Sequence, residues 1–145
     1  MTARRAVVVW PAKTPRVRQR AGETPAVDAR AARYLRVVAA LCADRGWPVP
    51  VAEYRFNADR RWRFDLCWPD QWIAVEVEGG LFSGGRHVRG ASLRREYAKL
   101  NDAQIRGWIV LMILPEQITN GTLSDLLAAY FARWYPVTFP AKGGA

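Results

Sequence analysis

The amino-acid sequence predicts an α/β sandwich of modest size. Apolar residues first recur with the period of a helix, and the period then changes to two over three consecutive segments, as it does in strands. Two more helical patterns follow, and between them lies a short, fully apolar segment with the length of one strand. The predicted order is therefore helix, three meandering strands, helix, strand, helix, with helices flanking a sheet.

The first helix is expected to run from Asp28, which can cap it, to about Arg45, with Gly46 as its stop. One face of this helix is apolar at positions i, i+3, i+4 and i+7. That stripe consists of Leu35, Val38, Ala39 and Cys42.

Three strands are expected at residues 51–56, 62–68 and 72–78, separated by the turn-forming residues 57–59 and 69–71. Alternation then assigns each side chain to one face of the sheet. In the second strand, one face is predicted to hold Trp62, Phe64, Leu66 and Trp68, and the other Arg63, Asp65 and Cys67. In the third strand, the core face is predicted to hold Ile73, Val75 and Val77, and the opposite face Ala74, Glu76 and Glu78.

In the second half of the chain, a Gly-rich loop is expected at 79–90, a helix from about 92 to 106 and a strand at 108–114. The inward stripe of that helix is predicted to be Leu93, Tyr97, Leu100 and Gln104. Thr122 and Asp125 resemble a capping box that starts the last helix. The broad apolar face of the last helix consists of Leu123, Leu126, Leu127, Tyr130, Phe131 and Trp134.

The 145 residues are expected to form one domain at 27–145, preceded by a basic extension at 1–26. Two interpretations of the extension stay open: an arm along a phosphate backbone, and a disordered tail. Cys42 and Cys67 match neither a CxxC pair nor a disulfide framework, so we expect buried thiols in a reducing cytosol. Without a membrane-spanning run or a signal peptide, the sequence predicts a soluble, cytoplasmic protein that does not bind membranes.

The net charge of +9 favours a polyanionic partner, and nucleic acid is the commonest one. The basic residues are mostly Arg, whose guanidinium suits phosphate. The alternative is that a GC-rich genome simply encodes many Arg residues.

The predicted strand pairing brings carboxylates together. A two-residue turn at Asp70 and Gln71 would set Asp65 directly across from Glu76, and a shift by one residue would bury both acids. Opposed like charges destabilise a sheet, whereas Mg²⁺ prefers oxygen ligands. We therefore expect a metal site formed by Glu53, Asp65, Glu76 and Glu78. The alternative is a solvated polar face with internal salt bridges.

Glu96 and Lys99 lie three residues apart on the flank of the predicted helix at 92–106. If that helix returns over the carboxylates, Lys99 would lie near a scissile phosphate and Glu96 near the metal. The alternative is an ordinary salt bridge between the two on the helix surface.

An ordered series of motifs over residues 53 to 114 resembles the PD-(D/E)XK nuclease superfamily. It is similar to small phage and bacterial endonucleases that include Holliday-junction resolvases, and more distantly to very-short-patch repair nucleases. The motifs are Glu53-Tyr-Arg-Phe56, Arg61-Trp-Arg-Phe-Asp-Leu-Cys-Trp-Pro69, Ala74-Val-Glu-Val-Glu-Gly-Gly80, Gly85-Arg-His-Val-Arg-Gly90, Glu96-x-x-Lys-x-Asn101 and Gly107-Trp-Ile-Val-Leu111.

The resemblance implies a restriction-endonuclease-like sandwich with Asp65 as the motif aspartate and Glu76 as the motif glutamate, together holding Mg²⁺, for which Mn²⁺ can substitute. Two positions depart from the motif: Phe64 stands in place of Pro, and Glu78 in place of the motif Lys. The resemblance suggests Lys99 as a migrated replacement, with Glu78 as a further metal ligand or general base.

The helical glutamate usual near the start of this fold has no firm counterpart. Asp28 is one candidate, but Glu53 fits the local motif better. Further catalytic candidates are Glu96 and His87, the single histidine, which could act as a general base, contact phosphate or be an ordinary loop residue. The residues expected to contact DNA are Arg55, Arg61, Arg63, Arg86, His87 and Arg89.

The expected function is that of a Mg²⁺-dependent endodeoxyribonuclease, in a bacterial cell or phage-infected host. A four-way junction is the first choice of substrate, and a homodimer is expected because a junction presents two strands related by approximate two-fold symmetry. Two alternatives are a nicking repair endonuclease of the very-short-patch type and a non-catalytic DNA-binding protein with a nuclease fold.

Overall fold

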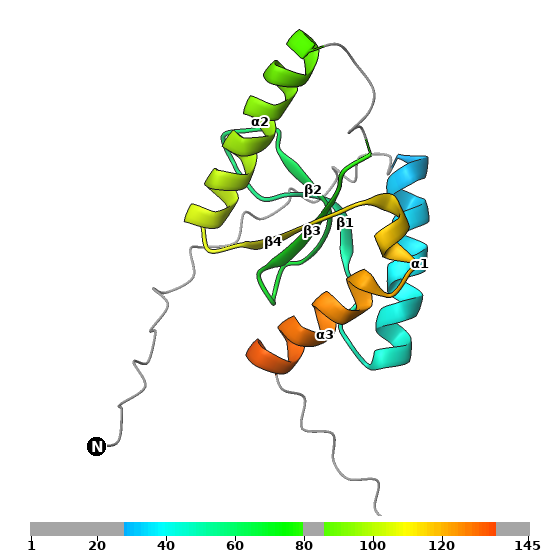
Figure 1. Ribbon diagram of the computed structural model, residues 1–145. Helices are drawn as coiled ribbons and strands as arrows, with labels where there is room; N and C mark the ends of the chain where they lie inside the picture. The colour runs from blue at the N-terminus through cyan, green and yellow to red at the C-terminus, as the bar shows by residue number, and fades with distance from the viewer. Residues whose placement is uncertain (1–27, 80–85, 136–145) are drawn as a thin grey trace, which may run out of the picture.

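The computed structural model describes the backbone of residues 28–79 and 86–135, and their side chains except in 86–89. This part of the chain has an α/β fold with a four-stranded mixed sheet and three α-helices (Figure 1), so the predicted fold class is confirmed at this level. The predicted extension at 1–26 lies outside the described residues. Within the described ranges, no helix is both long and apolar enough to span a membrane.

The first helix, α1 (Ala29–Arg45), begins and ends where the sequence predicts. The carboxylate of Asp28 caps it by accepting a hydrogen bond of 2.6 Å from the backbone N–H of Arg30. At the other end Gly46 has a φ of 68°, a left-handed conformation that costs glycine little. The buried residues of α1 are Ala31, Val38 and Cys42.

The sheet has the strand order β1-β2-β3-β4. The strands β1 (Val51–Arg55), β2 (Arg63–Trp68) and β3 (Ile73–Val77) form an antiparallel meander. The last strand, β4 (Ile109–Ile113), pairs in parallel with β3. The predicted meander with one further strand is therefore confirmed.

The register of β2 against β3 is also the predicted one. Leu66 pairs with Val75, and Trp68 pairs with Ile73. Continued by one residue, this register sets Asp65 opposite Glu76. The apolar pattern of the two strands was sufficient to predict it, because a slip of one residue would have turned every core side chain outward.

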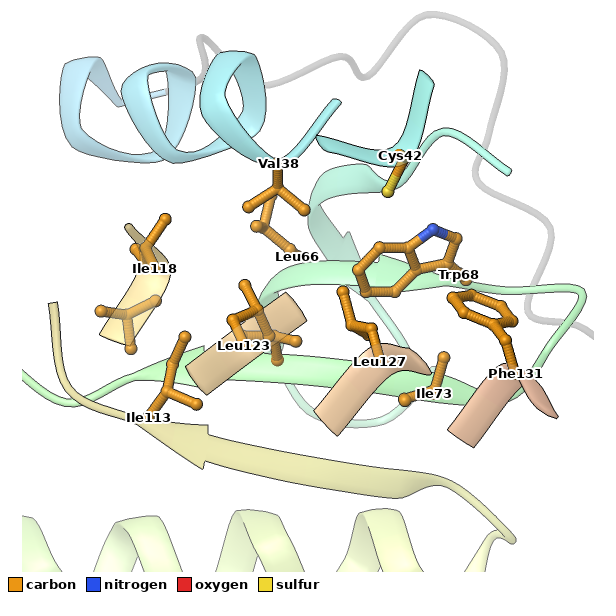
Figure 2. Packing of buried hydrophobic residues seen from close by; sticks show 12 residues of the cluster. Val38, Cys42, Leu66, Trp68, Ile73, Ile113, Ile118, Leu123, Leu127 and Phe131 are labelled. Carbon is orange, nitrogen blue, oxygen red and sulfur yellow. The ribbon is translucent and has the colours of Figure 1, made fainter. Parts of the chain in front are cut away.

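One face of the sheet is covered by α1 and α3 (Thr122–Trp134), and the opposite face by α2 (Arg86–Ile105) (Figure 1). The side chains of α1 and α3 meet those of the sheet in the larger core cluster (Figure 2). Its fully buried members include Val38, Cys42, Leu66, Trp68, Ile73, Val75, Leu123 and Leu127. Both cysteines are buried free thiols, as expected.

The smaller cluster lies under α2 and consists of Tyr54, Phe56, Phe64, Cys67, Ala74, Ala103 and Trp108. The prediction that Phe64 shares a face with Leu66 and Trp68 is therefore wrong. The alternation breaks between Leu66 and Phe64, next to Glu53 on β1, whose φ of 52° is in the left-handed region. Trp62 also packs against the smaller cluster.

The helix α2 differs from its prediction in two respects. It begins at Arg86, not near residue 92, so the expected loop at 79–90 is shorter. A single glycine, Gly90, costs a helix only about 1 kcal/mol relative to Ala and does not end it. The predicted inward stripe is also wrong: Leu93 is 48% and Tyr97 57% exposed, whereas Ala103 is fully buried.

The helix α3 begins at Thr122, but without the predicted capping box. Its N-cap is Gly121, and the side chain of Asn120 accepts a hydrogen bond from the Thr122 N–H at 3.0 Å. The side chains that α3 buries are Leu123, Leu127 and Phe131. A short 3-10 helix, η1 (Pro115–Ile118), which the sequence analysis did not predict, connects β4 to this segment.

Candidate active site

The candidate site forms where the backbone pairing of β2 and β3 ends. The last backbone pair is Leu66 with Val75. Beyond it, the carboxylate of Asp65 accepts a hydrogen bond of 2.8 Å from the backbone N–H of Val77. The Asp65 side chain thus takes the place of a backbone carbonyl of β2 as the acceptor for β3. Asp65 and Glu76 therefore lie side by side at the strand ends.

Glu76 is paired with Lys99 of α2. The Lys99 Nζ lies 2.6 Å from a carboxylate oxygen of Glu76, and only 19% and 14% of these two side chains are exposed. Burial raises the pKa of Glu76 to about 7, against the opposing effect of the Lys99 ammonium, and the Asp65 carboxylate adds to the rise. The ammonium also lies 5.9 Å from the ring centre of Phe64. Lys99 thus reaches the carboxylate strand, as the sequence predicts for a returning helix.

Glu53 of β1 belongs to the same group of carboxylates. Burial raises its pKa, the Asp65 carboxylate raises it further, and the Arg63 guanidinium opposes the rise. Arg63 lies 3.9 Å from the Glu53 carboxylate. Glu53 therefore lies near Asp65, as the strand pairing predicted.

The carboxyl groups of Glu78 and Glu96 lie within hydrogen-bonding reach of each other. Burial raises the pKa of Glu96, and the charge of Glu78 raises it further. Lys99 and Asp65 also act on the Glu96 carboxyl. The pair thus lies beside the site, and Glu96 and Lys99, which were predicted on the flank of the helix, are on its half-buried face.

Arg30 of α1 is a residue of the site that the sequence analysis missed. Its guanidinium donates a hydrogen bond of 3.3 Å to the carbonyl of Val77 and lies 3.9 Å from the Asp65 carboxylate. The spacing of α1 gives no signal for this role, because Arg30 reaches the strand end only through the packing of α1 on the sheet.

With this geometry in view, we compared the chain with known proteins. No family model, curated protein or solved structure matches it. The function is therefore argued from the residues of the site and from the resemblance of the motifs.

The residues predicted to contact DNA have different surroundings. Arg55 donates hydrogen bonds to the carbonyls of Asn57, Ala58 and Arg60, so its guanidinium holds the β1–β2 loop. Arg61 is exposed, and 40% of the Arg63 side chain is exposed. The other three, Arg86, His87 and Arg89, are in the first turn of α2 and not in a loop, which corrects the prediction, and their side chains lie outside the described residues.

A second buried polar group, also missed, connects the β1–β2 loop to α2. Asn57 is 3% exposed; its side chain donates to Asp102 at 2.7 Å and accepts from the backbone N–H groups of Asp59 and Arg60. Burial acts to raise the pKa of Asp102, but hydrogen bonds from Arg106 and Asn57 outweigh it and lower that pKa. The contact fixes the half of α2 that contains Lys99.

The site was tested against the divalent cation that the resemblance implies. Among the side chains described, no three His, Cys, Asp or Glu residues lie close enough together to enclose a metal ion. The donor type does fit: Asp65 and Glu76 offer carboxylate oxygens, the ligands that Mg²⁺ and Mn²⁺ prefer, and each raises the energy of the other's charge. These two are the residues that would hold such an ion, with Glu53 nearest to them on β1.

Proposed function

We propose that this chain is a metal-dependent endonuclease that hydrolyses phosphodiester bonds of DNA. One observation carries the proposal: Asp65, Glu76 and Lys99, from two strands and a helix, meet where the β2–β3 pairing ends. Two carboxylates for a cation and one ammonium for a phosphate are the groups that phosphodiester hydrolysis needs. The net charge of +9 supports a polyanionic substrate.

Each residue has a role in this proposal. Asp65 and Glu76 would hold Mg²⁺ or Mn²⁺, which supplies Lewis-acid polarisation of a phosphoryl oxygen when bound. Lys99 stabilises the negative charge that develops on the phosphate. Glu78 and Glu96 lie beside each other next to the site, and burial raises the pKa of Glu96, so a carboxylate of this pair can take up the proton that the attacking water loses.

We infer a branched DNA substrate, with a four-way junction first. The support is the resemblance of the motifs between Glu53 and Leu111 to small junction-resolving endonucleases, together with the net charge of +9. The main departure from the motif is Glu78, which stands in place of the motif Lys. Lys99 can take over the role of that Lys, because its ammonium reaches Glu76 from another element.

The test is cleavage of labelled four-way junction, flap, mismatched and plain duplex DNA, with Mg²⁺, with Mn²⁺ and with EDTA. The full chain should cut the junction only with a divalent cation. Asp65→Asn and Glu76→Gln should abolish cleavage and retain junction binding. Lys99→Met should lower the rate by about two to three orders of magnitude, because it removes a charge at the reacting phosphate.

The matched control is Arg95→Ala, which removes one positive charge from an exposed position of the same helix. It should change the rate only modestly. Near-normal cleavage by Asp65→Asn or Glu76→Gln, or equal effects of Lys99→Met and Arg95→Ala, would refute the assignment of the site. Binding of the junction without cleavage under every metal condition would instead identify a DNA-binding protein.

A further inference from the structure

Arg30, at the start of α1, reaches the end of β3, where it donates a hydrogen bond to the Val77 carbonyl. Four contacts define its position. The guanidinium lies 3.3 Å from the Val77 carbonyl, 3.9 Å from Asp65 and 5.7 Å from the ring centre of Tyr34. The fourth neighbour is Gly79, where an added Cβ atom would lie 3.2 Å from the Arg30 Nη1.

Stability alone does not explain this arrangement. An arginine that serves to neutralise a carboxylate usually approaches it to about 2.7–2.9 Å. Arg30 remains at 3.9 Å from Asp65, and 52% of its side chain is exposed. Such loose, solvated ion pairs contribute little to folding. The guanidinium therefore has donors directed at solvent beside the site.

Gly79 keeps this position open. Its φ is not in the left-handed region, so the backbone does not require glycine there. A side chain would instead press against the guanidinium, because 3.2 Å is tighter than an ordinary van der Waals contact. A methyl group at residue 79 would displace the guanidinium by a few tenths of an ångström.

The charges of the site make an anion the natural ligand. Asp65 and Glu76 repel a phosphate, so a DNA strand that enters needs positive charge close to both. Lys99 supplies it at Glu76 from α2, and Arg30 supplies it at Asp65 from α1, the helix on the opposite face of the sheet. The planar guanidinium of Arg30 can donate hydrogen bonds to two oxygens of one phosphate.

We propose that Arg30 binds a backbone phosphate of the DNA strand on the Asp65 side of the site. The inference rests on the proposed function, because it assumes a DNA strand at these carboxylates. It adds a substrate-binding residue that the motifs do not include.

The test measures binding of the full chain to fluorescent junction DNA in EDTA over a series of salt concentrations. Arg30→Ala should weaken binding about tenfold or more, as expected for a lost charge-assisted hydrogen bond. It should also reduce the log–log salt slope by about one. Arg30→Lys should retain the salt slope but not the full affinity, because an ammonium keeps the charge and loses the fork. Gly79→Ala should weaken binding less than Arg30→Ala does, because the guanidinium needs to shift by only a few tenths of an ångström.

The matched control is Arg36→Ala, an exposed arginine of the same helix, which should change affinity less than twofold. Thermal unfolding of all four variants separates a loss of contact from a loss of fold, and Arg30→Lys tests the position even if Arg30→Ala is unstable. Equal effects of Arg30→Ala and Arg36→Ala, or full affinity of Arg30→Lys, would overturn the inference. Because binding is measured without metal, this result is independent of whether the chain cuts DNA.

Discussion

At the scale of single residues, burying the charged carboxylate of Glu76 costs folding free energy. Its side chain is 14% exposed, and burial raises its pKa to about 7 despite the Lys99 ammonium at 2.6 Å. A buried ion pair of this kind rarely stabilises a protein relative to apolar residues of the same volume. Glu76 is therefore better explained by chemistry at the strand end than by folding.

This cost makes the stability of the metal-free protein depend on pH. The folded-state pKa of Glu76, about 7, lies above its ordinary value of 4.5. The folded state therefore binds the proton more tightly between these values, and its stability rises as the pH falls from 7.5 to 5. Glu76→Gln should lack this gain, which amounts to no more than about 3 kcal/mol. Urea unfolding of both proteins in EDTA at a series of pH values measures the difference.

Saturating Mg²⁺ should flatten the pH dependence of the wild-type protein, since a cation favours the ionised carboxylate. Glu116→Gln, at an exposed position of η1, is the control for removing one carboxylate. If wild type and Glu76→Gln have parallel pH profiles in EDTA, the burial of this charge has no effect on folding.

The sequence predicts Asp65 and Glu76 at this scale because the alternation of apolar residues fixes which side chains face each other. It does not predict Arg30, which lies 35 residues before Asp65 in the numbering and meets it only after α1 has packed on the sheet. Asn57 was missed for a similar reason. Its partner Asp102 is on α2, and no local pattern links the two.

At the scale of elements, α2 shows where hydrophobic periodicity fails. The pattern chose Leu93 and Tyr97 as the inward stripe, yet both are about half exposed. The face of α2 that meets the sheet instead carries Glu96, Lys99 and Ala103, because it covers carboxylates as well as an apolar cluster. A periodicity argument assumes that the buried face is apolar, and this assumption does not hold over a polar site.

The β2 strand shows a second limit of prediction from hydrophobic periodicity. Alternation was correct for Leu66, Cys67 and Trp68 and wrong for Phe64. The change occurs where Glu53, on the neighbouring strand, has a φ of 52°. A single left-handed residue other than glycine cannot be anticipated from periodicity, and such residues are enriched at functional sites.

The contact between the β1–β2 loop and α2 gives a prediction about stability. Asn57→Ala should lower the free energy of unfolding by about 1–3 kcal/mol, because it removes the acceptor of the Asp59 and Arg60 N–H groups and one of the two side-chain hydrogen bonds to the Asp102 carboxylate. Asn101→Ala, at an exposed position of α2, should change it by less than about 0.5 kcal/mol. Urea unfolding measures both. Equal stabilities of the two variants would show that the Asn57 contacts do not hold α2.

At the scale of the whole molecule, the order of elements and the mixed sheet could be predicted, because most of the sheet is built from segments close in sequence. The meander needs only short turns, and the parallel strand β4 follows from the helix that crosses over before it. The sequence offers two candidate segments for a dimer interface, the apolar residues 7–10 and the aromatic residues around 62–72. Trp68 is fully buried, and Trp62 and Trp72 pack against the smaller cluster. The other proposed interface segment, at residues 7–10, lies outside the described residues.

We still predict a homodimer in solution, because two strands of a four-way junction must be cut symmetrically and one site cannot address both. Junction DNA should bind much more tightly than linear duplex of the same length, and binding should weaken steeply with salt, by about −0.9 in log–log slope for each phosphate neutralised. Sedimentation velocity and binding titrations measure these properties. A monomer at micromolar concentration with equal affinity for junction and duplex would favour a nicking repair nuclease.

The packing of α2 has a consequence for the local opening of the site. Among its described side chains, Ala103 is the one that is buried, while Leu93, Tyr97 and Ile105 are 48%, 57% and 87% exposed. Detaching this helix would uncover the smaller cluster but leave the larger cluster between the sheet, α1 and α3 intact, so its local opening should require less free energy than global unfolding. Asp65 and Glu76 would remain in the sheet during such an opening, and Lys99 would leave. The fraction of molecules ready for chemistry is then set by the local stability of one helix, and not by the stability of the fold.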